Sequence, residues 1–287
     1  MNLTEKISQA LQHAVVHLGQ DVLACLDQAI MQESEDLDDI HGQASLTVLK
    51  AIKENLAIAD KTGLPMCQDT GMFDVFIALG RTCPLLPAQI EKAIIQGCKD
   101  AVVKASFRRS VVEEPVFERK NTLDNLPPIL HWDLVEGDSL VLSFLLKGFG
   151  SENCSSIRML NPTGGSAAVI AAVADIVRLA GGKPCPPIFL GVGLGGTMER
   201  AASLSKRALL REAGIANTSP SYALLEQQIL EKVQSLRIGS GGFGGRVTAL
   251  NVAVEYEPTH IAGMPLAVSI NCWADRKARV IWEGEDA

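Results

Sequence analysis

Five short segments constrain the fold most, because Gly, Pro, Cys and polar residues collect in them where the periodic apolar patterns stop. Glycine allows unusual backbone angles and proline fixes φ and lacks an N–H, so such segments mark turns and loops. Three of the five carry a cysteine in a predicted loop or at a predicted strand end. The segments are residues 64–71, 147–153, 183–187, 191–197 and 270–276.

Between these segments the apolar spacing predicts both helices and strands. Apolar residues recur at helical spacing from Leu3 to Leu26, and a second helix is expected over residues 44–59, giving a helical N-terminal part of about residues 1–62. Further helices are expected at 87–106, 164–179, 198–211 and 222–236, and strands at 74–80, 139–146, 187–190, 247–256, 266–270 and 278–282. Residues 113–128 read as a long loop.

Helices and strands mix without strict βα alternation, which favours an α+β class, a mixed layered α/β fold with a helical N-terminal region and irregular loops. No repeat or clear linker divides the chain, so residues 1–287 are interpreted as one domain.

The bulk composition excludes several classes of function. Hydrophobic residues make up 47% and charged residues 21%, as in ordinary folded proteins. The net charge of −7 disfavours a nucleic-acid partner, because phosphate binding needs clustered Lys and Arg. No apolar run reaches the roughly 20 residues that span a bilayer, and the polar N-terminus is unlike a signal peptide. We therefore expect a cytoplasmic protein without membrane contact.

The seven cysteines are odd in number and far apart, so a disulfide framework has no support. Cys25 and Cys98 lie in helical patterns and are expected to be core thiols. Cys83 precedes a proline in a loop and has no evident role. Cys154 is left open between a structural role and a ligand or catalytic role.

Cys67, Cys185 and Cys272 are the candidate metal ligands. A thiolate that ligates iron must leave the packed interior, and nearby N–H groups can then stabilise its charge. Cys185 stands between two prolines, and Cys67 and Cys272 are each followed closely by an acid, Asp69 and Asp275. The chain has no CxxC pair, so spacing alone leaves a three-cysteine cluster and three ordinary thiols both open.

The segment Gly191–Gly196 matches the pattern G-x-G-x-x-G, which suggests a dinucleotide-binding loop. The second strand ending in an acid is missing, since helices are expected there. The other interpretation is a tight strand-to-helix turn whose helix N-terminus favours an anion.

His260 and Arg108 are the candidates for acid–base work and for carboxylate binding. His260 follows a predicted strand in a loop that leads to Cys272, and histidine transfers protons near neutral pH. Arg108 and Arg109 close a predicted helix, where a guanidinium can bind a carboxylate with two hydrogen bonds or simply be solvated.

Taken together, these motifs resemble the iron–sulfur (class I) fumarate hydratases, specifically their alpha subunit or N-terminal catalytic region. The family's C-Q-D-T-G stands at 67–71, its K-G-G-G-S-E-N at 147–153 as K-G-F-G-S-E-N, and its glycine-rich run into a strand at 241–245 as G-G-F-G-G. Its cysteine before prolines is Cys185, its third cysteine is Cys272, and His260 has the family's spacing before it. The resemblance covers roughly residues 63–282. The alpha subunit of L(+)-tartrate dehydratase is similar too, although Gly-Ser-Glu-Asn looks more like the fumarate enzymes.

The resemblance implies a hydro-lyase (EC 4.2.1) that reversibly hydrates fumarate to L-malate. It implies a [4Fe–4S] cluster held by Cys67, Cys185 and Cys272, with one iron free of protein ligand that acts as a Lewis acid. Asp69 and His260 would protonate the departing hydroxyl. Gln68, Arg108 and Gly150 would contact the substrate carboxylates.

Two departures from the family bear on partners and substrate. Single-chain members carry a further C-terminal domain, whereas this sequence stops at Ala287, so a separate beta subunit, activity only with that subunit and an α2β2 assembly are expected. Phe149 replaces a family glycine, and two readings stay open: its ring alters specificity, or it packs away from the site. The alternatives are a tartrate dehydratase or other dicarboxylate dehydratase alpha subunit, and a nucleotide-binding enzyme that uses Gly191–Gly196.

Overall fold

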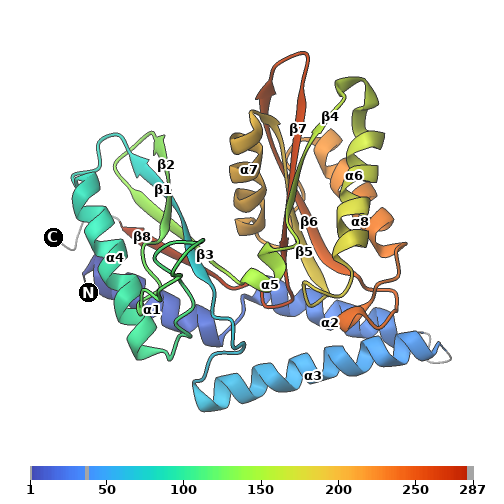
Figure 1. The fold of residues 1–287 in the computed structure, drawn as a ribbon, viewed down its shortest axis with the longest axis horizontal. Helices are drawn as coiled ribbons and strands as arrows, with labels where there is room; N and C mark the ends of the chain where they lie inside the picture. The colour runs from blue at the N-terminus through green and yellow to red at the C-terminus, as the bar shows by residue number, and fades with distance from the viewer. Residues whose placement is uncertain (1, 36–38, 283–287) are drawn as a thin grey trace. The chain divides into compact units, whose positions relative to one another are not determined.

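The computed structural model of the chain describes residues 2–35 and 39–282, and part of the predicted polar break at 32–39 lies outside them. It has two compact units that interleave along the sequence. The first contains Met1–Gly19, Asn55–Phe149 and Arg276–Ala287, and the second Gln20–Glu54 and Gly150–Asp275. Helices and mixed sheets occur in both (Figure 1), which confirms the α+β class.

The first unit is built on a four-stranded sheet of order β2-β1-β3-β8. Its strands are β1 (Met72–Gly80), β2 (Ile129–Val135), β3 (Leu140–Lys147) and β8 (Lys277–Trp282). β1 pairs with β2 in parallel and with β3 antiparallel, and β8 pairs antiparallel with β3. The helices α1 (Leu3–Val16) and α4 (Pro87–Lys104) pack on each other, and α1 also packs on β8.

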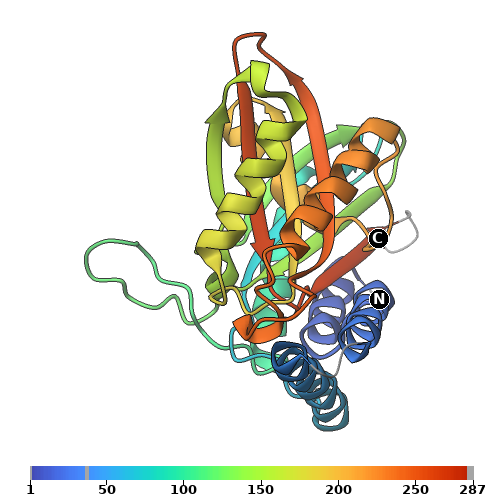
Figure 2. The same ribbon diagram turned by 90° about the vertical axis from the view of Figure 1, so that its right-hand side faces the viewer.

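The second unit has a second four-stranded sheet, of order β4-β7-β5-β6. Its strands are β4 (Ser156–Leu160), β5 (Ile188–Gly196), β6 (Ala249–Thr259) and β7 (Met264–Asn271). Only β5 and β6 run parallel. Helix α7 (Met198–Leu210) covers one face, and α6 (Gly165–Ala180) and α8 (Pro220–Gln234) lie side by side on the other (Figures 1 and 2).

The remaining elements are two N-terminal helices and three single-turn elements. α2 (Gln20–Ser34) belongs to the second unit, whereas α3 (Ile40–Thr62) contributes to both. The single-turn α5 (Phe149–Glu152) and the 3₁₀ turns η1 (Pro162–Gly164) and η2 (Ser240–Gly242) complete the structure. Residues 113–128 form the long loop that the sequence predicts (Figure 2), closed by an isolated bridge between Val112 and Asn121.

The helical spacing from Leu3 to Leu26 does not form one helix. His17 leaves the helical region with φ −121° and ψ 135°, while its N–H still bonds the carbonyl of His13, and α2 begins at Gln20. Leu18 is nevertheless buried, so the apolar period continues through the break. Apolar periodicity indicates which side chains are buried, but it does not reveal a short interruption of the backbone hydrogen bonds.

The glycine run Gly191–Gly196 is a strand, and the predicted loop is wrong. On β5 the residues Leu190, Val192 and Leu194 enter the core under α6 and α8. The alternate glycines face α7: a Cβ on Gly193 would lie 2.0 Å from the Ala201 carbonyl oxygen, and one on Gly191 2.0 Å from that of Ser205. These two glycines let a helix backbone rest directly on the strand.

Helix α6 together with η1, Pro162–Ala180, is long and apolar enough by composition to cross a membrane. Here its apolar side, including Val173 and Val177, packs into the core of the second unit. Asp175 and Arg178 interrupt the apolar run, so the sequence has no uninterrupted stretch of membrane-spanning length there.

Candidate functional site

Cys185 and Cys272 lie at the same end of the central strands of the second unit. Phe189 on β5 pairs with Asn271 on β7, so Cys272 follows directly at the level of Ile188. Cys185 stands three residues before the start of β5. Two of the three candidate cysteines, far apart in sequence, thus lie at the same end of two neighbouring central strands.

The turn that carries Cys185 presents its thiol to solvent. Cys185 is exposed and has φ +54°, a left-handed conformation that is uncommon for a residue with a Cβ. Its N–H donates to the Gly182 carbonyl at 3.2 Å, and the Pro186 carbonyl accepts from the Gly241 N–H at 2.7 Å. The backbone on both sides of this exposed thiol is therefore fixed by hydrogen bonds.

The Cys272 turn is closed by a buried amide–carboxylate contact. Asn271 Nδ2 donates to Asp275 Oδ1 at 2.6 Å, and Ser151 Oγ donates to Asn271 Oδ1 at 3.4 Å. Asn271 and Asp275 are 0% and 1% exposed. Because Ser151 belongs to the segment 147–153, this network ties two of the five sequence motifs together.

Cys67 belongs to the first unit, in the irregular segment before β1. Its preceding residue is fixed twice: Met66 N–H donates to the Val15 carbonyl at 3.0 Å, and Asn55 Nδ2 donates to the Met66 carbonyl at 2.8 Å. Cys67 is half-buried.

Asp69 is held by two backbone donors from opposite sides. Gly71 N–H donates to Oδ1 at 3.2 Å, and Phe149 N–H donates to Oδ2 at 2.8 Å. Gly71 has φ +90°, and a Cβ there would lie 2.8 Å from the backbone of Leu146, so only glycine fits. The motif 67–71 and the start of motif 147–153 are thereby joined through one carboxylate.

Two buried cations accompany Asp69, and sequence reasoning gave neither a role. Lys147 is 2% exposed and its Nζ donates to the Gly148 carbonyl at 3.2 Å. Arg276 is 1% exposed, and its Nε and Nη1 have no hydrogen-bond partner among the described residues. A Cβ on Gly148 would lie 3.2 Å from Asp69 Oδ2 and 3.6 Å from Arg276 Nη2, so both groups flank that glycine. Burial of a cation near a carboxylate would mark both residues as functional candidates. Burial cannot be read from the linear sequence.

Arg108 lies beside the Cys67 segment, although not at the end of a helix. α4 ends at Lys104, and the Arg108 N–H donates to Thr70 Oγ1 at 3.1 Å while its carbonyl accepts from Asn125 Nδ2 at 2.8 Å. Its side chain and that of Gln68 are exposed. Gly150 is exposed on α5, and its carbonyl lies 3.6 Å from Cys154 Sγ.

His260 does not lie next to Cys272 within the second unit. It follows β6, in the turn that leads into β7, and its Nδ1 accepts from the Ala262 N–H at 3.2 Å. All of β7 separates it from Cys272, roughly 25 Å at about 3.3 Å per strand residue. The expected strand between the two residues is thus present, and it carries them to opposite ends of the sheet.

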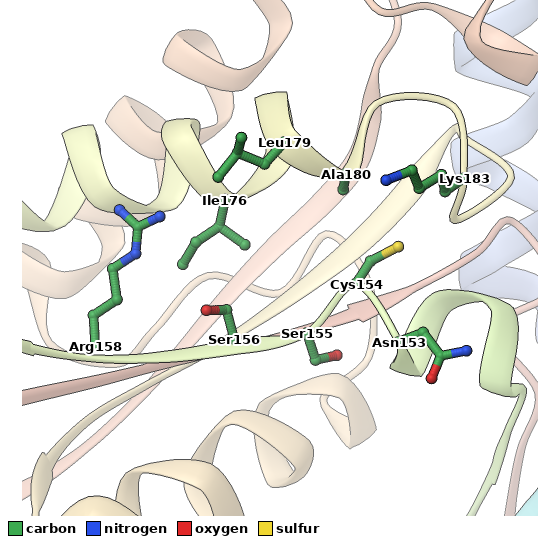
Figure 3. A pocket seen from close by; sticks show the side chains of 9 residues that line it. All are labelled: Asn153, Cys154, Ser155, Ser156, Arg158, Ile176, Leu179, Ala180 and Lys183. Atoms are coloured by element: carbon green, nitrogen blue, oxygen red, sulfur yellow. The ribbon is translucent and has the colours of Figure 1, made fainter.

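The other cysteines separate into a core thiol and less buried ones. Cys98 is fully buried in α4, and burial raises the pKa of its thiol far above the usual range, as expected for a core residue. Cys154 lines a pocket of ≈ 230 Å³ between β4 and the end of α6 (Figure 3). Arg158 at that pocket is paired with Asp175 at 2.6 Å.

Among the described residues, no group of three His, Cys, Asp or Glu side chains is close enough to hold a metal ion. The three candidate thiols are divided between the units, with Cys67 in the first and Cys185 and Cys272 in the second.

Comparison with known proteins gives one consistent result. A putative L(+)-tartrate dehydratase subunit alpha from Methanocaldococcus jannaschii is 36% identical over 282 residues, 97% of this chain and 96% of that protein. An L(+)-tartrate dehydratase subunit alpha from Escherichia coli O157:H7 is 29% identical over 283 residues, 97% of this chain and 90% of that protein. The model of the family described as fumarate hydratase (Fumerase) matches residues 4–281. The chain therefore belongs to the Fumerase family.

Proposed function

We propose that this chain is the alpha subunit of an iron–sulfur hydro-lyase that adds water to, or removes it from, a small dicarboxylic acid. The observation that carries the proposal is the meeting of Cys185 and Cys272 at one end of β5 and β7 in a chain of the Fumerase family. In any other role, the position of both cysteines at the same strand end would be a coincidence.

The donor set fits an iron–sulfur cluster. Cys67, Cys185 and Cys272 are half-buried or exposed, whereas the core thiol Cys98 is sealed. Iron–sulfur clusters are held by thiolates in irregular backbone where N–H groups can reach the sulfurs. We assign the three cysteines as ligands of a [4Fe–4S] cluster. When bound, its one iron without a protein ligand would supply Lewis acidity to the substrate hydroxyl.

Asp69 is our candidate for the group that transfers a proton to the departing hydroxyl. The two backbone N–H donors fix both carboxylate oxygens, which orients the remaining lone pairs. The buried cations Lys147 and Arg276 beside it, and the exposed Gln68 and Arg108, offer positive or hydrogen-bonding groups to a dicarboxylate. Gly150 remains a predicted carboxylate contact.

His260 remains a catalytic candidate only under a condition that its position in the fold imposes. Because β7 separates it from Cys272 in its own chain, its imidazole would have to be presented by a second copy of the chain. Mixed assemblies of an Asp69→Asn and a His260→Asn chain would then recover activity that neither variant has alone. Absence of recovery, with normal activity of His260→Asn, would remove the residue from the mechanism.

The substrate is open between fumarate with L-malate and L(+)-tartrate. The segment Gly150–Asn153 is similar to the fumarate enzymes, whereas the relatives are named tartrate dehydratases. Initial rates with fumarate, L-malate and L(+)-tartrate, measured on the same cluster-loaded preparation, decide between them through kcat/KM.

A separate beta subunit is proposed from the relatives, which carry the designation subunit alpha. We expect little or no turnover from this chain alone, full turnover after the beta subunit is added, and an α2β2 assembly in the cytoplasm. Turnover by the purified chain without a partner would contradict this part of the proposal.

Iron and acid-labile sulfide measured after anaerobic reconstitution test the core of the proposal. The wild type should bind about four of each per chain, as a [4Fe–4S] cluster requires, and Cys67→Ser, Cys185→Ser and Cys272→Ser should each bind less. Cys83→Ser is the matched control and should bind as the wild type does. A wild type without iron, or a cluster indifferent to all three variants, would exclude the mechanism.

A further inference from the structure

The glycine loop, residues 239–245 between α8 and β6, contains a family motif to which the proposed chemistry assigns no task. It contacts two other parts of the second unit. One is the pair of helices α2 and α3, and the other is the turn that carries Cys185. The contacts on the two sides suggest why the motif is present.

On the helix side the loop is tied to one buried carboxylate. Glu33 on α2 is 1% exposed, and its Oε1 accepts from Arg246 N–H, Val247 N–H and Ser45 Oγ, each at 2.8 Å. Ser45 Oγ in turn accepts from the Ser240 N–H at 3.0 Å. One carboxylate oxygen thus holds the end of the loop directly and its beginning through one hydroxyl.

The fit around Glu33 leaves no room for change. A Cβ on Gly245 would lie 2.7 Å from Glu33 Oε1 and 2.7 Å from Ser45 Cβ. His41 Nδ1 on α3 donates to the Phe243 carbonyl at 3.0 Å. A buried carboxylate is costly unless it is hydrogen-bonded, so an acid kept here indicates that holding the loop is its task.

On the other side the loop supports the backbone around Cys185. Gly241 N–H donates to the Pro186 carbonyl at 2.7 Å. A Cβ on Gly242 would lie 2.7 Å from the Gly182 Cα, and Gly182 accepts the Cys185 N–H. The residues before and after the thiol therefore rest on the loop that Glu33 holds.

We propose that Glu33 is a positioning residue that fixes the direction of the Cys185 thiolate through the glycine loop. The inference rests on the proposed function, because it assumes that Cys185 ligates the cluster. Groups behind a metal ligand set its orientation and tune the metal, and the glycine loop supports the backbone on both sides of Cys185. Glu33 itself touches neither substrate nor cluster.

The test uses Glu33→Gln, Ser45→Ala and the control Asp27→Asn. Gln keeps the shape and one oxygen of Glu33 but removes the charge that strengthens three hydrogen bonds. Asp27 lies on the same helix, paired on the surface with Lys53 at 2.8 Å, so its variant makes the same charge change away from the loop. Each full chain, with its partner subunit present, is reconstituted anaerobically.

Three measurements separate positioning from folding. Amide hydrogen exchange of residues 239–248 and 182–188 in the cluster-free chain reports the loop. Cluster loss to a chelator and the reduction potential of the cluster report the ligand. We expect Glu33→Gln and Ser45→Ala to exchange roughly tenfold faster in both segments, the factor for one weakened charge-assisted hydrogen bond, and to lose the cluster faster at a shifted potential. Asp27→Asn should match the wild type throughout.

The outcomes distinguish this inference from the proposed function. Unchanged exchange in Glu33→Gln, or faster exchange with an unchanged potential and unchanged cluster loss, overturns the inference and leaves the proposed function intact. A wild type that binds no cluster overturns the proposed function and with it the ligand role of Cys185. Faster exchange, faster cluster loss and a shifted potential together support the inference.

Discussion

The two sheets have the same strand count and the same mix of one parallel and two antiparallel pairs, yet they prepare their residues in opposite ways. The second sheet is covered by helices on both faces, and its strand register brings the segments that carry Cys185 and Cys272 to one end of β5 and β7. In the first unit the proposed proton-transfer residue Asp69 lies in an irregular segment, where two backbone N–H groups hold its carboxylate. Ligands of a rigid cofactor suit a sheet end, whereas a proton-transfer group suits a loop whose backbone amides can aim it.

The largest effect on activity is expected for Asp69, in the irregular segment of the first unit. Asp69→Asn keeps the shape of the side chain but removes the transferable proton, so kcat should fall by about 10²–10⁴. Iron content and circular dichroism should remain those of the wild type. Asp74→Asn would be a poor control because Asp74 is buried and bonded to His131, so the exposed Asp138, in the turn between β2 and β3, serves instead as Asp138→Asn. Near-normal turnover of Asp69→Asn would end the assignment.

In the second unit, a single methyl group added to β5 should disrupt the packing of α7 on the sheet. In Gly193→Ala the new Cβ would meet the Ala201 carbonyl oxygen, so α7 must move away from the sheet, which should cost about 3 kcal/mol of unfolding free energy. Gly263→Ala, where nothing lies within 4 Å, should change stability by less than about 0.5 kcal/mol. Urea unfolding of both variants checks the contrast. Equal stabilities would mean that α7 does not rest on the glycines.

A smaller effect is expected where the chain departs from its family. Phe149 is 47% exposed while its N–H is bonded to Asp69, so the ring can change without loss of that bond. Phe149→Gly should shift the ratio of kcat/KM between fumarate and L(+)-tartrate by roughly tenfold, the scale of one apolar contact in a substrate pocket. Phe117, more exposed still on the loop 113–128, provides the control variant Phe117→Gly. A constant ratio in Phe149→Gly would show that the ring packs away from the substrate.

The smallest effect concerns pH and the end of α1 in the first unit. His13 stacks on His17 with ring centroids 4.3 Å apart, and burial, then the neighbouring His17, lowers the pKa of His13 below 6.5. The unfolded chain then binds a proton more readily than the folded one, so stability should fall as pH drops below 6.5 and recover above it. His13→Gln should flatten this part of the profile measured by thermal unfolding. An unchanged slope would assign it to other groups.

Sequence patterns predicted the strongly periodic elements well and two edge strands poorly. The segments that became β1, α4, β3, α6, α7 and α8 were found within a few residues, as were the edge strands β6 and β8. β2 and β4 were missed because both their faces are partly exposed and their side chains show no clean apolar–polar alternation. The glycine run on β5 was wrongly predicted to be a loop. Glycine is needed there because the backbone of α7, several residues further along the chain, packs directly against the strand.

The sequence by itself determined the class of fold, the family resemblance and the three candidate thiols, because these depend on residue type and local spacing. Only the tertiary structure decided that Cys185 and Cys272 share a strand end, that His260 lies at the opposite end of β7, and that Lys147 and Arg276 are buried beside Asp69. These facts follow from strand pairing and packing between residues distant in sequence, which local patterns do not encode.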